Sequence, residues 1–348
     1  MRKPFRLTIF ALLAALALGI AACGGDDDDD NGGGGGGGSS TEQKSIKAGV
    51  VTDIGGLNDR SFNFLANKGL EDAESDLGVQ GRVLLSKSNA DYVPNLSTLG
   101  QQQYNMIVSV GFRMGDATNT VAGKFPNSNF AIVDFSATAL KDKPKNVQGL
   151  LFKEQEAGYL VGYLAGLWAK DNNAKAISSV GGEKIPPVDH YIAGYKAGAT
   201  AANPGIQVLN GYSQDFVDQA KCKEIALNQI AQGSKVVFQV AGQCGLGALD
   251  AAKEKKVQGI GVDADQAYLG PHILTSALKK VDVAVFDAIK RDQDGKFKGG
   301  TDVIATVENG GVGIGKLGPA GEKYADQIKK VQDDIASGKI SDIPDTVK

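Results

Sequence analysis

The stretch IKAGVVTDIGGLNDRSFNFLANKGLEDAESDL, residues 46–77, contains one complete strand-and-helix unit. It opens with a short apolar run, 46–51, and closes with a segment, 62–77, whose apolar residues recur at the spacing of one helix face. A polar turn that contains two glycines separates the two. A strand followed by a helix is the repeating unit of α/β proteins, so this stretch predicts how the rest of the body is built.

The same rhythm continues along the body of the chain. Strand-like apolar runs recur, and helix-period segments lie between many of them. The further runs are 83–85, 106–110, 130–133, 147–152, 176–180, 206–209, 236–240, 259–262 and 303–307, with helix-period segments such as 154–169, 191–202, 216–232 and 246–255. Short runs that are apolar throughout predict strands of parallel sheets, which helices cover on both faces. Some ten strands are too many for one ordinary sheet, so we predict an α/β fold with two doubly wound parallel-sheet lobes.

The most apolar part of the body is AGYLVGYLAGLW, residues 157–168. It is bracketed by Glu156 and Lys170 and falls short of the roughly 20 residues that a membrane span needs. We therefore predict a buried helix here.

Composition excludes several classes of protein. The 348 residues, 42% of them hydrophobic, are enough for two buried cores. The net charge of −3 approaches zero once the basic start of the chain and the aspartates of 26–30 are set aside, so there is no overall basic surface for nucleic acid. The chain has three cysteines, without C-x-x-C spacing, and two histidines, which argues against a zinc or iron–sulfur site. We expect no metal and no cofactor.

Residues 1–23 have the layout of a secretory signal peptide. Three basic residues precede an apolar run at 7–20, and the small residues Ile20-Ala21-Ala22 lead to Cys23, as in a bacterial lipobox. Cys23 is thus the predicted lipidation site and first residue of the mature chain. The alternative is an ordinary signal peptide in which the cysteine is accidental. The apolar run is too short for an uncleaved membrane anchor.

A linker follows. Residues 24–40, GGDDDDDNGGGGGGGSS, include no apolar side chain, which predicts a flexible, solvated leash over 24–45. Its aspartates lack the spacing of a calcium-binding loop. A lipid, a leash and a globular body together predict a protein anchored on the extracytoplasmic face of a bacterial cell membrane.

Aspartates stand at the ends of three predicted strands. In parallel sheets, ligands bind beyond the carboxyl ends of the strands. Asp53, Asp134 and Asp263 each follow such a run, and the run 236–240 leads to Gly242. Ionised carboxylates accept hydrogen bonds and suit ligands that carry hydroxyl or N–H groups. Any one of the three could instead be a helix N-cap or a turn residue.

No catalytic motif accompanies these aspartates. The chain lacks G-x-S-x-G, H-E-x-x-H and a P-loop lysine, and the turn after the first strand lacks the G-x-G-x-x-G of dinucleotide-binding proteins. The sequence therefore favours binding over catalysis, and we expect that the protein is not an enzyme.

Several motifs in order resemble the basic membrane protein family. Its members are lipoprotein substrate-binding components of ABC importers, and the best understood bind purine nucleosides. The resemblance implies a type I periplasmic-binding-protein fold, with two lobes joined by a hinge of three crossing segments. It is carried by DIGGLNDRSFN (53–63), FKEQEAGYLVGYLAG (152–166), GGEKIPPVDHYIAGYKAGA (181–199), DFVDQAK (215–221), GVDADQ (261–266) and LTSALKKVD (274–282). The implied lobes are 46–153 plus about 281–311, and 154–280 plus about 312–348.

The resemblance also implies a nucleoside site. Phe62 and Phe216 match the aromatic residues that stack on the two faces of the purine. Asp53 and Asp134 match positions near the base edge, while Gly242, Asp263 and Lys280 match those that hold the ribose hydroxyls.

Four neighbouring residues qualify this assignment. Lys279 and Asp265 are the alternatives to Lys280 and Asp263. Ile54 and Phe64 depart from the family pattern, since each stands where a polar side chain is usual.

The resemblance further implies the protein's role. We expect a monomeric receptor that binds purine nucleosides such as guanosine, inosine or adenosine and delivers them to ABC permease and ATPase subunits. One alternative is a protein of the same fold that binds a sugar or another small signalling ligand. A nucleoside hydrolase is disfavoured, because the carboxylates are spread over different strands instead of clustered at one strand end.

Cys222 and Cys244 remain. An even pair of cysteines in an exported protein favours a disulfide. Both lie near the ligand-facing edge of adjacent strand-and-helix units, one early in the helix after Phe216 and the other before the next helix. We predict a bridge, with two buried thiols as the alternative.

Overall fold

The structure, a computed structural model, describes residues 45–347. The predicted signal peptide, the lipidation site Cys23 and the linker up to residue 44 lie outside the described residues. Within the part that the structure describes, none of the helices has the length and apolar character of a membrane span.

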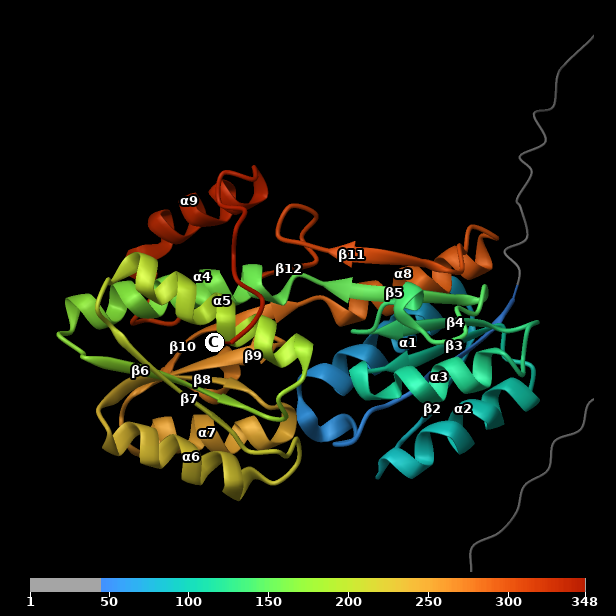
Figure 1. The fold of residues 1–348 in the computed structure, drawn as a ribbon, viewed down its shortest axis with the longest axis horizontal. Coiled ribbons are helices and arrows are strands. Elements are labelled where there is room, and N and C mark those ends of the chain that lie inside the picture. Colours follow the sequence, from blue (N-terminus) through green and yellow to red (C-terminus); the bar gives the residue numbers. More distant parts are fainter. Residues whose placement is uncertain (1–44, 348) are drawn as a thin grey trace, which may run out of the picture. The chain divides into compact units, whose positions relative to one another are not determined.

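The first lobe is built on a six-stranded sheet in the order β2-β1-β3-β4-β5-β11, in which every pairing is parallel. Helices α1 (Phe62–Leu77) and α8 (Val281–Gln293) pack on one face of the sheet, and α2 (Tyr92–Gln101) and α3 (Gly115–Ala122) on the other (Figure 1). The strands are β1 (Lys47–Val51), β2 (Gln80–Leu84), β3 (Met106–Val110), β4 (Asn129–Val133), β5 (Val147–Phe152) and β11 (Thr301–Ala305).

The second lobe repeats this plan with the order β7-β6-β8-β9-β10-β12. Its pairings are parallel except that β12 runs antiparallel to β10. The strands are β6 (Ala176–Gly181), β7 (Gln207–Tyr212), β8 (Ser234–Val240), β9 (Gln258–Asp263), β10 (Ile273–Lys279) and β12 (Val312–Ile314). The helices are α4 (Glu154–Asp171) and α5 (Pro186–Ala202) on one face, α6 (Gln219–Ala231) and α7 (Gly242–Glu254) on the other, and α9 (Ala325–Ala336) against α4.

The two sheets confirm the predicted α/β fold with two doubly wound lobes. The chain passes between the sheets three times, after β5, after β10 and after β11. These passages fall where the hinge segments are expected, although the predicted lobe boundaries themselves stay predictions.

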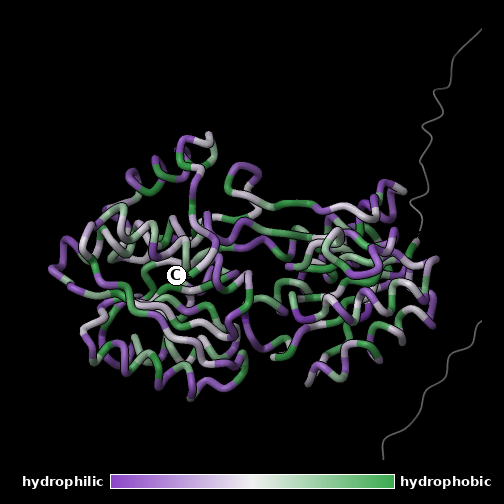
Figure 2. The backbone as a smooth tube through the Cα atoms, in the orientation of Figure 1, coloured by the Kyte–Doolittle hydropathy of each residue, from purple (hydrophilic) through white to green (hydrophobic). Residues whose placement is uncertain are grey.

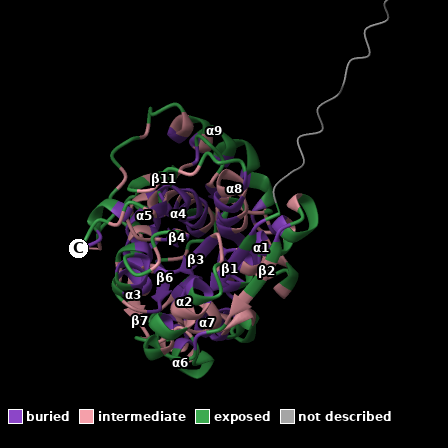
Figure 3. Cartoon of the chain, turned by 90° about the vertical axis from the view of Figure 1, so that its right-hand side faces the viewer, coloured by how far each residue is buried: buried purple, intermediate pink, exposed green. Residues whose placement is uncertain are grey.

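The strands are buried on both faces, as their uninterrupted apolar character predicts. In β1 the side chain of Val50 belongs to the apolar cluster under α1 and α8, while Val51 belongs to the cluster under α2 and α3. Both side chains are fully buried. Figure 2 shows hydrophobic strands inside each lobe, and Figure 3 shows the buried interior beneath exposed helix surfaces. Alternate residues of a strand thus build two separate cores.

The structure differs from the predicted elements in a few places. Strands β10 and β12 were not predicted, because β10, ILTSALK, mixes polar residues with helix-forming leucine and alanine, and β12 has only three residues. Helix α5 begins earlier than predicted, at Pro186 and Pro187, which are well suited to a first helical turn. Helix α6 begins later, at Gln219, because the Asp218 side chain accepts a hydrogen bond from Ala220 N and caps it.

Helices α4 and α5 approach each other so closely that backbone touches backbone. A Cβ atom added at Gly158, Gly162, Gly194 or Gly198 would overlap a main-chain carbonyl oxygen of the other helix. The apolar segment 157–168 lies in α4, which confirms the predicted buried helix. Glycine is needed at these positions because no side chain fits between the two backbones.

We expect Gly162→Ala to lower the free energy of unfolding by about 1–3 kcal/mol, since the new methyl group must push α4 away from Tyr195 of α5. Gly123→Ala is the matched control, because the nearest atom to its added Cβ is 3.8 Å away. Urea denaturation of both variants is the measurement. Equal stability of the two variants would contradict this account of the packing.

Candidate functional site

A cleft lies where the carboxyl ends of the two sheets face each other. Doubly wound sheets bind ligands beside the strand at which the order reverses, and that strand is β1 in the first lobe and β6 in the second. The space between the lining atoms is about 640 Å³, a value that includes open solvent at the mouth of the cleft. Its lining comes from both lobes and includes Asp53 and Gly111 after β1 and β3, and Ala241 and Gly242 after β8.

Aromatic side chains enter the cleft from both lobes. Two of them are the predicted stacking residues. Phe62 is the first residue of α1, Phe216 lies in the loop between β7 and α6, and both line the cleft. Phe112 and Tyr191 also line the cleft, and both were missed by the sequence analysis. Phe112 follows β3 directly, so extending the strand-end search to that run would have found it.

Asp53 is buried at the end of β1. Its Oδ1 accepts a hydrogen bond from Ile54 N at 2.7 Å and another from the Tyr92 hydroxyl. Its backbone N donates to Asn63 Oδ1 at 3.0 Å, which ties the strand end to α1. Burial raises the pKa of the Asp53 carboxyl, although these hydrogen bonds oppose the shift. Asp53 is therefore a fixed acceptor and not a helix cap.

A buried lysine connects the lobes at the base of the cleft. Lys279, the last residue of β10, is 2% exposed, and its Nζ lies 2.6 Å from Asp134 Oδ1 and 2.9 Å from Glu154 Oε1. The same Nζ lies 5.2 Å from the ring centre of Phe62 and 4.8 Å from that of Phe152. Asp134 follows β4 of the first lobe, so the Lys279–Asp134 ion pair joins the two sheets.

The protonation of this cluster follows from its charges. Burial alone would lower the pKa of Lys279, but Asp134, Glu154 and Asp263 outweigh it and raise that pKa. Burial, with Glu154 and Asp263, raises the pKa of Asp134 against the opposing effect of Lys279. Burial would also raise the pKa of Glu154, yet Lys279 and His190, whose Nδ1 is 3.0 Å from Glu154 Oε2, lower it. Lys279 is thus a permanent cation surrounded by carboxyl groups.

Asp263 ends β9 and also contacts both lobes. Its Oδ2 accepts from Ser61 Oγ of the first lobe at 2.8 Å, and its Oδ1 accepts from the Tyr191 hydroxyl at 3.2 Å. Burial raises the pKa of its carboxyl. Asp263 and Asp134 both have left-handed backbones, with φ of 60° and 68°, and they occupy the same place in the two equivalent sheets.

Helix α1 is capped by Asp59 and not by Asp53. The Asp59 carboxylate accepts from Ser61 N, Asn63 N and Phe64 N at 2.7–3.1 Å. Burial raises its pKa to about 6. Asp59 also lines the cleft, so the start of α1 and Phe62 on it are held at the site by this cap.

For two of the predicted ligand-binding positions, the sequence left a neighbouring residue as the alternative, and the structure shows which of the two lines the cleft. Lys280, not Lys279, was the predicted cleft residue, and this placement is wrong: Lys279 lines the cleft, while Lys280 is exposed and lies outside it. Successive residues at a strand end point to opposite sides, which separates the two lysines. Asp263 lines the cleft and Asp265 does not, since Asp265 accepts from Ala267 N and Lys316 N in a neighbouring turn.

Most of the predicted site residues line the cleft. Asp53, Phe62, Asp134, Phe216, Gly242 and Asp263 all line the cleft. Of the two departures from the family pattern, Ile54 lines the cleft and Phe64 is 44% exposed outside it. Cys222 and Cys244 form a disulfide close behind the site.

The lining carries more acidic than basic groups. Asp53, Asp59, Asp134 and Asp263 are its carboxyl groups, and Lys279 supplies its one side-chain ammonium group among the lining residues. Within residues 45–347, no set of three or more His, Cys, Asp or Glu side chains is arranged to hold a metal ion.

Comparison with known proteins shows the family. The family described as ABC transporter substrate-binding protein, PnrA-like, matches residues 46–346, so this chain belongs to that family of solute-binding proteins. The chain is 38% identical to the ABC transporter nucleoside-binding protein BmpA of Lactococcus lactis, over 85% of this chain and 88% of that protein. It is 35% identical to an uncharacterized lipoprotein of Pyrococcus abyssi, over 88% and 76% of the two chains. The predicted family resemblance is confirmed.

Solved structures show the same fold. A solute-binding protein of an ABC transporter system from Aeropyrum pernix superposes with a TM-score of 0.77 at 28% identity, covering 86% of this chain and 94% of that one. A second, from Conexibacter woesei, gives a TM-score of 0.71 at 22% identity over 87% and 100%. Together they confirm the type I periplasmic-binding-protein fold.

We expect Lys279→Met to lower the free energy of unfolding by about 3–5 kcal/mol, because it leaves Asp134 and Glu154 buried without their cation. The exposed neighbour provides the control: Lys280→Met should change stability by less than about 0.5 kcal/mol. Chemical denaturation at neutral pH measures both. A comparable loss in the two variants would show that the Lys279 ion pairs do not hold the lobes.

Proposed function

We propose that this chain is the membrane-anchored receptor of an ABC importer and that its cleft binds a purine nucleoside, such as guanosine, inosine or adenosine, for delivery to the permease. The observation that carries the proposal is the presence of Phe62 and Phe216, from opposite lobes, in one cleft with buried carboxylates. A flat heterocycle between two aromatic rings, with a polar sugar beside it, matches this lining.

Stacking supplies affinity in this proposal. A base stacked on an aromatic side chain gains about 1–3 kcal/mol per contact, largely independent of which base it is. Because Phe62 belongs to the first lobe and Phe216 to the second, a ligand between them holds the lobes together. The ligand would then stabilise the arrangement in which both rings contact it.

Hydrogen bonding supplies specificity. Asp53 and Asp134 are proposed to accept from the base edge, and Asp263 from the ribose hydroxyls. Lys279 replaces Lys280 in the proposed set, as a donor to the sugar. Gly242 begins α7, so its N–H has no partner within the helix and is a further donor.

The charge of the cleft favours a nucleoside over a nucleotide. Four carboxyl groups and one ammonium group line it, and that one cation, Lys279, is already paired with Asp134 and Glu154, which leaves no free cation for a phosphate among the lining residues. A nucleoside is neutral and offers several hydroxyl and N–H donors. The relative from Lactococcus lactis is named for nucleoside binding, which agrees with this choice.

We also propose that Cys23 carries the lipid. Its sequence context is that of a lipobox, and relatives of this chain are named as lipoproteins. A leash of some twenty residues would then let the receptor reach its transporter while it stays at the membrane. The proposed role is binding without catalysis, by a monomer.

For the ligand, we expect Phe216→Ala to weaken guanosine and free hypoxanthine alike, by about 1–3 kcal/mol, because both lose one stacking face. Asp263→Asn should weaken guanosine but spare hypoxanthine, since it removes a charged acceptor for hydroxyl groups worth about 1.5–3 kcal/mol. Calorimetry with guanosine, inosine, adenosine, hypoxanthine and ribose is the measurement. Val217→Ala, an exposed neighbour of Phe216, is the control and should bind as the wild type does.

Two results would count against the ligand proposal. Unchanged guanosine binding by both Phe216→Ala and Asp263→Asn would mean that the site lies elsewhere. Binding of ribose, or of another sugar, without any nucleoside would keep the receptor role and reject the nucleoside.

For the anchor, Cys23→Ser should release the exported protein from the membrane fraction, because no thioether can form and firm anchoring needs the several acyl chains of a lipidated cysteine. Ser40→Ala, in the same linker, should leave the protein in the membrane fraction. Fractionation and fatty-acid labelling measure this. Wild-type protein found unlabelled in the soluble fraction would refute the anchor.

A further inference from the structure

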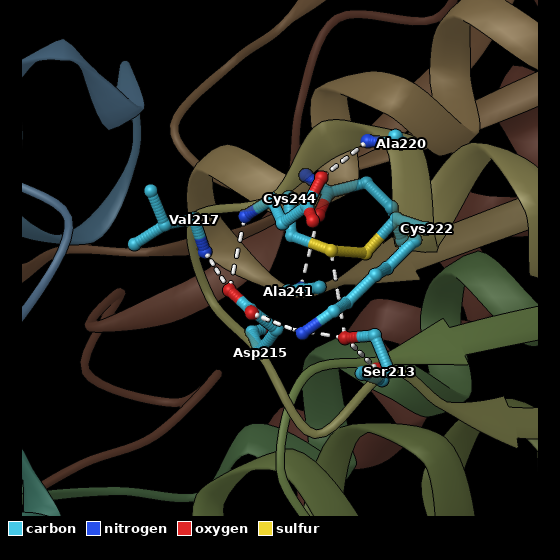
Figure 4. The surroundings of a disulfide bond; sticks show 11 residues. Ser213, Asp215, Val217, Ala220, Cys222, Ala241 and Cys244 are labelled. Carbon is cyan, nitrogen blue, oxygen red and sulfur yellow. Dashed lines mark hydrogen bonds and ion pairs between the residues drawn. A yellow bond between two sulfur atoms is a disulfide. The ribbon is translucent and has the colours of Figure 1, made fainter.

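A disulfide joins the starts of two neighbouring helices (Figure 4), close in the chain to the cleft residues Phe216 and Gln243. Cys222 lies in the first turn of α6 and Cys244 in the first turn of α7, with their Cα atoms 5.5 Å apart. Both cysteines are fully buried. A Cβ on Gly247 of α7 would overlap the carbonyl oxygen of Gln219, so the two helix starts are in close contact.

The loop that carries Phe216 runs straight into α6. Its beginning is fixed to the sheet, because Ser213 N and Gln214 N donate to the carbonyl oxygens of Gly181 and Gly182 at 2.9 and 3.0 Å. Its middle is shaped by Asp215, whose carboxylate accepts from Val217 N and Asp218 N and contacts Lys221 Nζ at 2.7 Å (Figure 4). Lys221 lies next to Cys222, so the end of the loop moves with the first turn of α6.

Phe216 is also bound to α7. Its carbonyl oxygen accepts a hydrogen bond from Cys244 N at 3.0 Å. Its ring lies against Gly182, where a Cβ would overlap it, and near Gly242, where an added Cβ would be 3.9 Å from the ring. The position of the Phe216 aromatic ring in the cleft therefore depends on how α6 and α7 lie relative to each other.

The disulfide and the backbone contacts together form a closed cycle of links between the loop, α6 and α7. From Phe216 the chain leads to Cys222, the disulfide leads to Cys244, and the Cys244 N–H returns to the Phe216 carbonyl oxygen. Every link is covalent except this one hydrogen bond. Between the loop and α7, the disulfide is thus accompanied by that hydrogen bond and by a contact of Cys244 Sγ with Ser213 Oγ at 3.4 Å.

The fully buried apolar packing around the bridge is made of small side chains, and Ile225, Leu227 and Ile230 of α6 pack partly buried against it. Besides the cysteines, the buried cluster between α6, α7 and the sheet contains five alanines and three valines. Alanine buries little apolar area, so packing contributes less here than in a leucine-rich core. The disulfide then adds a covalent constraint on how the two helix starts can move, beside the ion pairs of Lys223 on α6 with Asp250 and Glu254 on α7.

We propose that the Cys222–Cys244 disulfide is a positioning element for ligand binding, which holds the Phe216 ring in the cleft. The inference rests on the proposed function, in which Phe216 stacks on the base. Without the bridge, the loop of 213–218 and the start of α6 shift against α7, and binding must first order the ring, which lowers affinity.

The test is a double-mutant cycle between the disulfide and the ring. Calorimetry with guanosine compares the wild type, Cys222→Ala/Cys244→Ala, Phe216→Ala and the triple variant. We expect the cysteine pair to raise Kd about tenfold in the presence of Phe216, and less than about twofold in the Phe216→Ala background, because the coupling runs through that ring. If the alanine pair does not fold, Cys222→Val with Cys244→Ala restores much of the lost volume.

A control separates positioning from general stability. Val257→Ala removes apolar contacts from the same cluster at the far end of α7, so it should lower the unfolding temperature and leave Kd unchanged. Should the cysteine variant bind guanosine with the wild-type Kd, or lose equal affinity with and without Phe216, the disulfide only stabilises the lobe and the proposal fails.

A second readout needs no ligand. Amide hydrogen exchange should be faster at residues 213–218 and at position 244 in the cysteine variant than in the wild type, while the strands β6 and β8 keep their protection. Unchanged exchange in the loop would overturn the inference. If the wild type binds no guanosine but the loop exchanges faster in the variant, the disulfide positions the ring and the nucleoside proposal alone falls.

Discussion

The interaction on which the site depends is the buried ion pair between Lys279 of β10 and Asp134 after β4. An ammonium group that is 2% exposed is stable only if carboxylates surround it, and here they come from both lobes. The pair therefore constrains the lobes to meet with β4 and β10 end to end. Phe62 and Asp263, which flank the same lysine, take their places in the cleft from that alignment. Of these charges, the ammonium group is the one that both carboxylates share, so Asp134 and Glu154 depend on it for compensation in the buried interior.

Much of this architecture could be predicted from the sequence, because parallel sheets follow simple rules. Uninterrupted apolar runs predicted the strands of both lobes except β10 and β12, and the rule that ligands bind at carboxyl ends singled out Asp53, Asp134 and Asp263. All three line the cleft. The rule works because it depends only on strand direction, which a repeating strand-and-helix pattern determines.

Other parts of the site could not be predicted in this way. The choice between Lys279 and Lys280 needs the register of β10, a strand that the sequence analysis did not find. Tyr191 lies within α5, and its place in the cleft follows from how that helix packs on α4 through glycine contacts. The capping role of Asp59 likewise depends on a turn whose backbone no periodicity describes.

The left-handed backbones of Asp134 and Asp263 restrict how this binding site can vary among related sequences. At φ near 60°, residues other than glycine, asparagine and aspartate are strained, so few substitutions are tolerated at either position. The two positions are equivalent in the two sheets, which means that each half of the molecule presents a short polar group at the same height above its strands. Divergence in ligand preference should then accumulate at unstrained neighbours such as Ile54 and Phe112, around two positions that the backbone restricts to aspartate, asparagine or glycine.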